Sequence, residues 1–113
     1  MTEKKYDLAE RTEKFCLDCR ALIRSLVKDI ANIEDGKQLA RSSGSVAANY
    51  LEADEAISKK DFVLRIKICR KEARESQLWL KSLHTENTTE QSRLIDEAKQ
   101  LVKIFNAIIE KTK

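Results

Sequence analysis

Two of the three cysteines, Cys16 and Cys19, have the Cys-x-x-Cys spacing that is typical of redox-active and zinc-binding sites. A zinc site takes four ligands, and the sequence offers only Cys69 and the single histidine, His84, as further thiol or imidazole ligands. Cys19 falls on an apolar helical stripe, where a thiol is usually a small buried apolar side chain. We therefore expect reduced, structural thiols, and we predict no metal and no cofactor.

The other residue types that catalysis uses are also sparse. His84 lies in a polar stretch and has no carboxylate or nucleophile near it in the sequence. Glu72 and Glu75 are three residues apart on one helix face, but a di-iron bundle also needs Glu-x-x-His motifs, which this sequence lacks. Phosphate-binding glycine loops, nucleophile elbows and metalloprotease helices are absent from the sequence as well. The sequence predicts a protein that is not an enzyme.

Basic residues are concentrated in one part of the chain. Residues 58–83 contain 8 basic and 3 acidic residues, a net charge of +5, whereas the whole chain of 113 residues carries +3. Six of these cations fall within roughly a third of a helix circumference, away from the apolar stripe. They are Lys60, Lys67, Arg70, Lys71, Arg74 and Lys81.

Two interpretations of this basic face remain open. A row of cations can follow phosphates and gain affinity by releasing counterions, which would make RNA or DNA a partner. The more ordinary interpretation is a solvated face that is balanced by the neighbouring segment 34–57, whose net charge is −3.

A second polar row precedes the basic face. Its members are Arg41, Ser45, Asn49 and Glu52, at spacings of four, four and three. Polar groups near a core need partners, because each orphaned group costs about 1–3 kcal/mol. The row therefore indicates either a network that reaches the next helix or an interface between subunits, and the sequence does not choose between them.

The elements that carry these residues are predicted to be helices. The chain has no proline and 2 glycines, too few turn-forming residues for an all-β fold. Apolar residues recur at spacings of three and four in four segments, at about 7–30, 34–57, 58–83 and 90–112. We expect helix N-caps at Asp7, at Ser58 and at Thr88 or Thr89. The first turn is predicted at residues 32–36, because Asp35-Gly36 typically ends a helix.

The second segment is the hardest to interpret. Residues 41–45, Arg-Ser-Ser-Gly-Ser, look like a loop by composition. A helix instead aligns the small and apolar residues of this region on one face, and we predict that it is continuous. Four helices with short connections predict an all-α, up-down-up-down antiparallel four-helix bundle that forms a single domain over 1–113. Without an apolar run of about 18 residues or an apolar leader, we expect a cytoplasmic protein with no membrane segment.

The residues also resemble a known family, the four-helix-bundle proteins encoded in intervening sequences of bacterial 23S ribosomal RNA genes. Accessory variability proteins of diversity-generating retroelements belong to the same group. The resemblance covers about residues 6–83. It is carried by Tyr6-Asp7-Leu8, Arg11-Thr12, Phe15, Gln38-Leu39-Ala40-Arg41-Ser42, Ser45-Val46, Ala48-Asn49-Tyr50-Leu51-Glu52-Ala53, Ser58-Lys59-Lys60-Asp61-Phe62, Lys71-Glu72-Ala73-Arg74-Glu75 and Trp79-Leu80.

The resemblance implies more than the periodicity does. It implies a helix that is unbroken through Gly44, and a homopentamer of five bundles around a central channel. The retroelement relatives bind nucleic acid and associate with a reverse transcriptase, whereas the ribosomal relatives have no settled activity. The modest charge of +3 per chain favours the ribosomal type.

Overall fold

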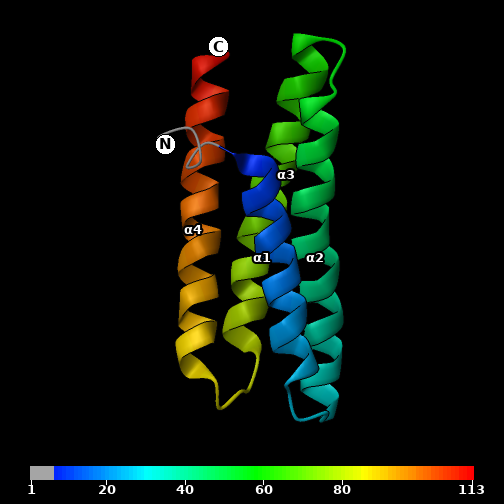
Figure 1. Ribbon diagram of the computed structural model, residues 1–113, viewed down its shortest axis with the longest axis vertical. Helices are drawn as coiled ribbons and strands as arrows, with labels where there is room; N and C mark the ends of the chain where they lie inside the picture. The colour runs from blue at the N-terminus through cyan, green and yellow to red at the C-terminus, as the bar shows by residue number, and fades with distance from the viewer. Residues whose placement is uncertain (1–6) are drawn as a thin grey trace.

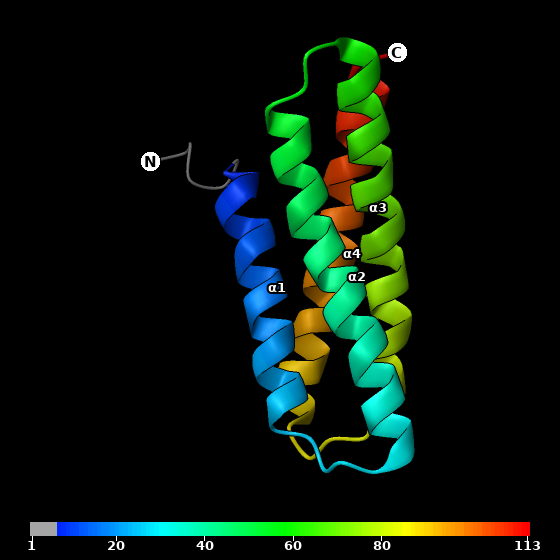
Figure 2. The ribbon, with the colours of Figure 1, turned by 90° about the vertical axis from the view of Figure 1, so that its right-hand side faces the viewer.

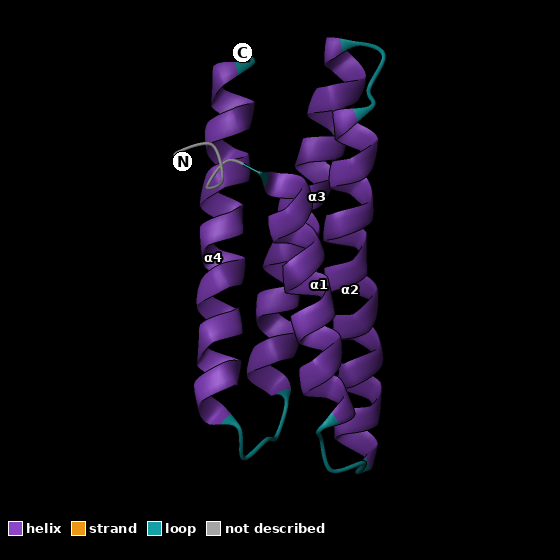
Figure 3. Cartoon of the chain, viewed as in Figure 1, coloured by secondary structure: helices purple, strands orange, loops and turns teal. Residues whose placement is uncertain are grey.

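The computed structural model describes residues 7–113, which form four α-helices and no strand. The helices are α1 (Leu8–Arg24), α2 (Ile30–Asp54), α3 (Lys59–Ser82) and α4 (Thr88–Lys111), and the fold class is all-α, as predicted. All four extend along the long axis of the molecule (Figures 1 and 3). The α1–α2 and α3–α4 loops lie at one end, and the α2–α3 loop lies at the other (Figure 1).

Helix α2 is central to the packing. It contacts both α1 and α3, and α3 in turn contacts α4, whereas α1 and α4 touch over a much smaller area. Figure 2 shows α2 between α1 and α3. All four helices contribute to one apolar core, whose largest fully buried apolar side chains are Phe15, Leu39, Val46, Ile66, Leu80, Leu94, Leu101 and Phe105.

Two of the predicted caps are confirmed, and one is wrong. The Asp7 side chain accepts a hydrogen bond from the backbone N–H of Glu10, and Ser58 accepts one from Asp61. At the start of α4 the cap is Asn87, whose side chain accepts from Glu90, rather than Thr88 or Thr89. An asparagine is as good an N-cap as a threonine, so composition alone did not separate these adjacent positions.

The first turn was predicted in the wrong place. Helix α1 ends at Arg24 rather than near residue 30, and α2 begins at Ile30 rather than at residue 34. The Asp29 carboxylate caps α2 by accepting from the Asn32 N–H at 2.8 Å. As a result Ile30, which the sequence placed at the end of the first helix, is the first residue of α2 and is 81% exposed.

Gly36 therefore lies inside α2 and does not end a helix. Its missing side chain permits close contact with α1, because a Cβ added at Gly36 would lie 3.3 Å from Cγ2 of Ile23. The Asp35-Gly36 pair resembled a turn because a glycine that admits a neighbouring helix looks the same in sequence as one that stops a helix. The C-terminal end of α2 was also predicted slightly too long, since the helix stops at Asp54 rather than at residue 57.

The prediction that α2 continues through Gly44 is confirmed. No glycine among the described residues has a positive φ angle, so the backbone conformation at Gly44 does not require a glycine. None of the four described helices contains a stretch that is long and apolar enough to cross a membrane.

Substitution Gly44→Ala should raise the free energy of unfolding by about 0.5–1 kcal/mol, because alanine favours a helix interior over glycine by about that amount. The closest atom to the added Cβ is Nη2 of Arg20, at 3.2 Å, and the end of that flexible side chain can move. Urea denaturation followed by circular dichroism measures the change. Gly36→Ala is the control. It should raise the free energy of unfolding by less, because the added Cβ would meet Ile23 within the α1–α2 contact. A large loss of stability from Gly44→Ala would contradict a continuous α2.

Candidate nucleic-acid interface

The six predicted cations all lie on α3, and five of them are exposed. The sixth, Arg70, is half-buried because its Nη1 donates a hydrogen bond to Oδ1 of Asn106 on α4, at 2.7 Å. This contact fixes the orientation of the basic face, which borders α4 rather than α2. The five exposed cations are Lys60, Lys67, Lys71, Arg74 and Lys81.

Within the described residues, none of the six cations has a carboxylate within 4.0 Å. In particular, no acidic residue of the segment 34–57 forms an ion pair with these cations. Instead, two of the three acidic residues of α3 pair with a cation of α2, since Arg41 lies 3.2 Å from Glu72 and 2.7 Å from Glu75. The basic face of α3 thus keeps its charge available for an anionic partner.

Helix α4 extends this face with residues that sequence reasoning missed. Lys99 and Lys103 are exposed and lie seven and three residues before Asn106, so they share the side of α4 that borders Arg70. Neither lysine forms an ion pair in the described structure. One acidic residue, the exposed Asp96, lies on the same side of α4, seven positions before Lys103. We call the cations that meet at this helix pair the α3–α4 basic face. They are Lys60, Lys67, Arg70, Lys71, Arg74, Lys81, Lys99 and Lys103.

The basic face also contains two exposed apolar residues, Leu64 and Leu78, each 54% exposed. Together with the cations they follow alternating spacings of four and three along α3, at positions 60, 64, 67, 71, 74, 78 and 81. That spacing forms a single straight seam on a helix. The surface is therefore mixed in character, with leucines set between lysines and arginines.

The second polar row lies between α2 and α3. Arg41 pairs with the two glutamates of α3, as described above. Asn49 donates to the carbonyl oxygen and Oγ of Ser45, and it accepts a hydrogen bond from Nη1 of Arg65 on α3 at 3.1 Å. Glu52 is exposed, and no described cation pairs with it. The structure thus makes two separate α2–α3 contacts from the row, one from Arg41 and one from Asn49 with Ser45, and leaves Glu52 outside both.

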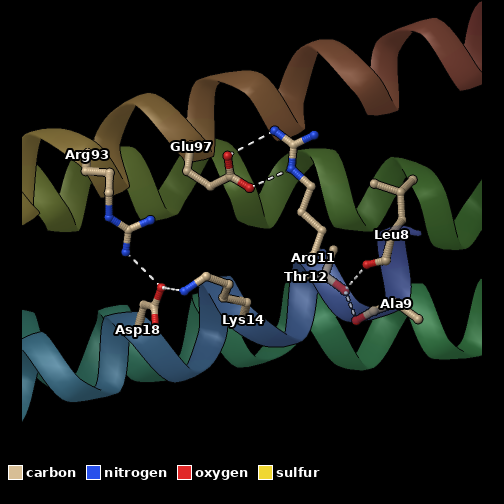
Figure 4. Close-up of polar contacts among 8 residues, drawn as sticks. All are labelled: Leu8, Ala9, Arg11, Thr12, Lys14, Asp18, Arg93 and Glu97. Carbon is tan, nitrogen blue, oxygen red and sulfur yellow. Dashed lines mark hydrogen bonds and ion pairs between the residues drawn. The ribbon is translucent and has the colours of Figure 1, made fainter. Parts of the chain in front are cut away.

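Ion pairs join α1 to α4 (Figure 4). The Arg11 guanidinium donates two hydrogen bonds to the Glu97 carboxylate, at 2.7 and 3.0 Å. Asp18 accepts from both Lys14 and Arg93, each at 2.8 Å. These pairs neutralise the cations at this seam, which leaves the excess positive charge on the α3–α4 side.

The ion pairs shift the titration of their members. Burial of Asp18 opposes its ionisation, but the hydrogen bonds from Lys14 and Arg93 outweigh this effect and lower its pKa. The hydrogen bond from Arg93 likewise lowers the pKa of Glu90. The pKa of Arg11 is raised by its hydrogen bond to Glu97.

The cysteines are free thiols. Burial raises the pKa of both Cys19 and Cys69 to about 12, so these two thiols stay protonated near neutral pH. Cys16 is half-buried and accepts a hydrogen bond from Nη1 of Arg20. In residues 7–113 no three His, Cys, Asp or Glu side chains come close enough together to hold a metal ion.

His84 contributes to the structure through its backbone. Its backbone N–H donates to Oδ1 of Asn32, and its carbonyl oxygen accepts from Nδ2 of the same side chain. Asn32 also donates to the carbonyl oxygen of Val27. One buried asparagine therefore ties the α1–α2 loop to the α3–α4 loop.

These features define a class: a four-helix all-α protein with a basic face on α3 and α4. The chain belongs to the family described as 23S rRNA-intervening sequence protein, whose family model matches residues 4–110. It is similar to a crystal structure of a protein of unknown function from the S23 ribosomal protein family of Bacteroides thetaiotaomicron. The two share 26% sequence identity and a TM-score of 0.77, over 89% of this chain and 96% of that one. No curated protein matches the sequence.

Substitution Asp18→Asn should lower the free energy of unfolding at pH 7 by about 0.5–1 kcal/mol, the usual range for partly exposed ion pairs. Because the folded protein lowers the pKa of Asp18, the unfolded chain binds its proton more readily, and stability is lost as pH falls. The difference between wild type and variant should shrink between about pH 5 and pH 3. Urea denaturation across this range measures it.

Asp96→Asn is the matched control, since Asp96 is exposed and forms no ion pair within the described residues. It should leave the pH dependence unchanged. A wild-type to Asp18→Asn difference that stays constant down to pH 3 would mean that the ion pairs of Asp18 do not stabilise the fold.

Proposed function

We propose that this chain is a non-enzymatic, cytoplasmic protein that self-assembles and binds RNA or DNA through the α3–α4 basic face. The observation that supports this most directly is the set of exposed cations on two helices with no carboxylate in ion-pair range among the described residues. Cations elsewhere, such as Arg11, Arg41 and Arg93, are held in ion pairs. The α3–α4 basic face thus gathers eight cations that have no ion pair within residues 7–113.

Assembly is the second half of the proposal. Up-down-up-down antiparallel bundles that associate as a homopentamer would repeat the basic face five times. Five copies at +3 each carry +15, and repeated weak contacts to one nucleic acid raise the overall affinity. A cyclic assembly would present these faces as a ring.

The alternative is that the same surface docks a protein, as the retroelement relatives dock a reverse transcriptase. The exposed Leu64 and Leu78 favour this alternative, since phosphates gain nothing from leucine side chains. A complex that persists after nuclease treatment would support protein docking, and one that dissociates would support nucleic-acid binding.

The triple variant Arg74→Gln, Lys99→Gln and Lys103→Gln tests the nucleic-acid interface. Fluorescence anisotropy with a labelled RNA and a labelled DNA duplex should show a loss of affinity of about tenfold or more at about 50 mM salt. The slope of log affinity against log salt should fall by about 2–3, because each phosphate contact contributes roughly one.

A control with the same change of net charge is Arg24→Gln, Lys28→Gln and Lys37→Gln, at the α1–α2 end of the molecule. It should bind almost as well as the wild type. Equal losses in both triple variants would show that net charge, not the basic face, determines binding. No measurable binding by the wild type at low salt would reject the nucleic-acid proposal.

A further inference from the structure

An acidic groove lies where the start of α1 meets the end of α2. It has a volume of about 380 Å³ and is lined by Asp7, Ala9, Glu10, Glu13, Ala47 and Leu51. The floor is apolar, and Leu51 is 57% exposed there. We call this surface the acidic groove.

Acidic residues surround this floor. Glu13 is exposed and has no ion pair within residues 7–113. The same holds for Asp54 and Glu55 at the end of α2, which lie three and four residues after Leu51 and so share its side of the helix. An apolar floor inside an acidic rim suits a partner that offers an apolar side chain surrounded by cations.

The N-terminal half of α3 has that arrangement. Leu64, 54% exposed, has Lys60 four residues before it, Lys67 three residues after it, and Lys71 seven residues after it. These spacings place the four side chains on one side of the helix. All three lysines are exposed and lack ion pairs in the described structure. We call these four residues the basic knob.

The two surfaces are placed so that neighbouring copies can join them. Both lie toward the end of the molecule that holds the α2–α3 loop (Figure 1), and α1 and α3 flank α2 in the view of Figure 2. Rotation about an axis parallel to the helices keeps each surface at its own height. A contact between two different surfaces at similar heights can therefore repeat around a ring until it closes.

We infer that the basic knob of one copy inserts into the acidic groove of the next copy. Leu64 packs against Leu51 and the alanines of the groove, and the knob lysines pair with Glu13 and the acidic residues at the end of α2. This contact rests on the self-assembly part of the proposed function and specifies which surfaces meet. It covers Lys60, Lys67 and Lys71, and it leaves Arg70, Arg74, Lys81, Lys99 and Lys103 for nucleic acid.

The first test compares Leu64→Asp with Leu78→Asp. The two leucines have the same exposure and lie on the same side of α3, but only Leu64 belongs to the basic knob. Light scattering after nuclease treatment should show Leu64→Asp reduced toward the 13.0 kDa mass of one chain. Leu78→Asp should keep the wild-type mass. Dissociation by both variants would overturn the assignment of the contact to the knob.

The second test exchanges the charges. Lys67→Glu with Lys71→Glu should weaken assembly, and so should Glu13→Lys, because each places like charges across the contact. All three substitutions in one chain should restore the wild-type mass, since the charges are complementary again. Circular dichroism checks that each variant stays helical, which Glu and Lys both favour.

The outcomes separate the two proposals. A wild type that is monomeric at high concentration rejects self-assembly and this contact together. A wild type that assembles, with variants that assemble equally well, rejects only the pairing of knob and groove. Lys99→Glu with Lys103→Glu, on the α3–α4 basic face outside the knob, should lose nucleic acid but keep the assembled mass.

Discussion

The structure depends on the close approach of α1 and α3 to an uninterrupted α2. Small side chains make this approach possible. Ser42 and Ser76 are fully buried, and their hydroxyl groups share a hydrogen bond of 2.8 Å between α2 and α3. Ser76 also donates to the carbonyl oxygen of Glu72, so the pair satisfies itself without water. On the α1 side, Gly36 and Gly44 leave room for Ile23 and Arg20.

The same arrangement determines where charge remains. Because α2 and α3 pack closely, Arg41 reaches Glu72 and Glu75, and the acidic residues of α3 are used within the fold. Because α1 and α4 touch over a small area, the seam between them is joined by the ion pairs of Arg11 and Arg93. What these pairs leave over is a basic surface on α3 and α4 and an acidic groove between α1 and α2. Both the nucleic-acid proposal and the assembly proposal follow from this distribution.

Sequence reasoning predicted the fold class, the core stripes and the continuity of α2, because each depends on spacing along one helix. The buried Cys19 confirms its placement on an apolar stripe. It misplaced the first turn, since Asp29 and Asp35 are both reasonable helix-terminal residues in isolation. Packing decided between them. Gly36 has no side chain and therefore lets α2 approach Ile23 of α1, and a turn at Gly36 would remove this contact.

The sequence by itself determined four amphipathic helices, two of their caps and a helix with an excess of positive charge, because all of these are local in the chain. Only the tertiary structure decided which cations are neutralised and which stay available. Arg93 is paired across 75 residues with Asp18, whereas Lys99, two turns further along the same helix, is not. The tie between Asn32 and His84, 52 residues apart, is equally invisible in the sequence. Pairing between distant residues depends on how the helices are rotated against one another, and that rotation is set by packing the whole core at once.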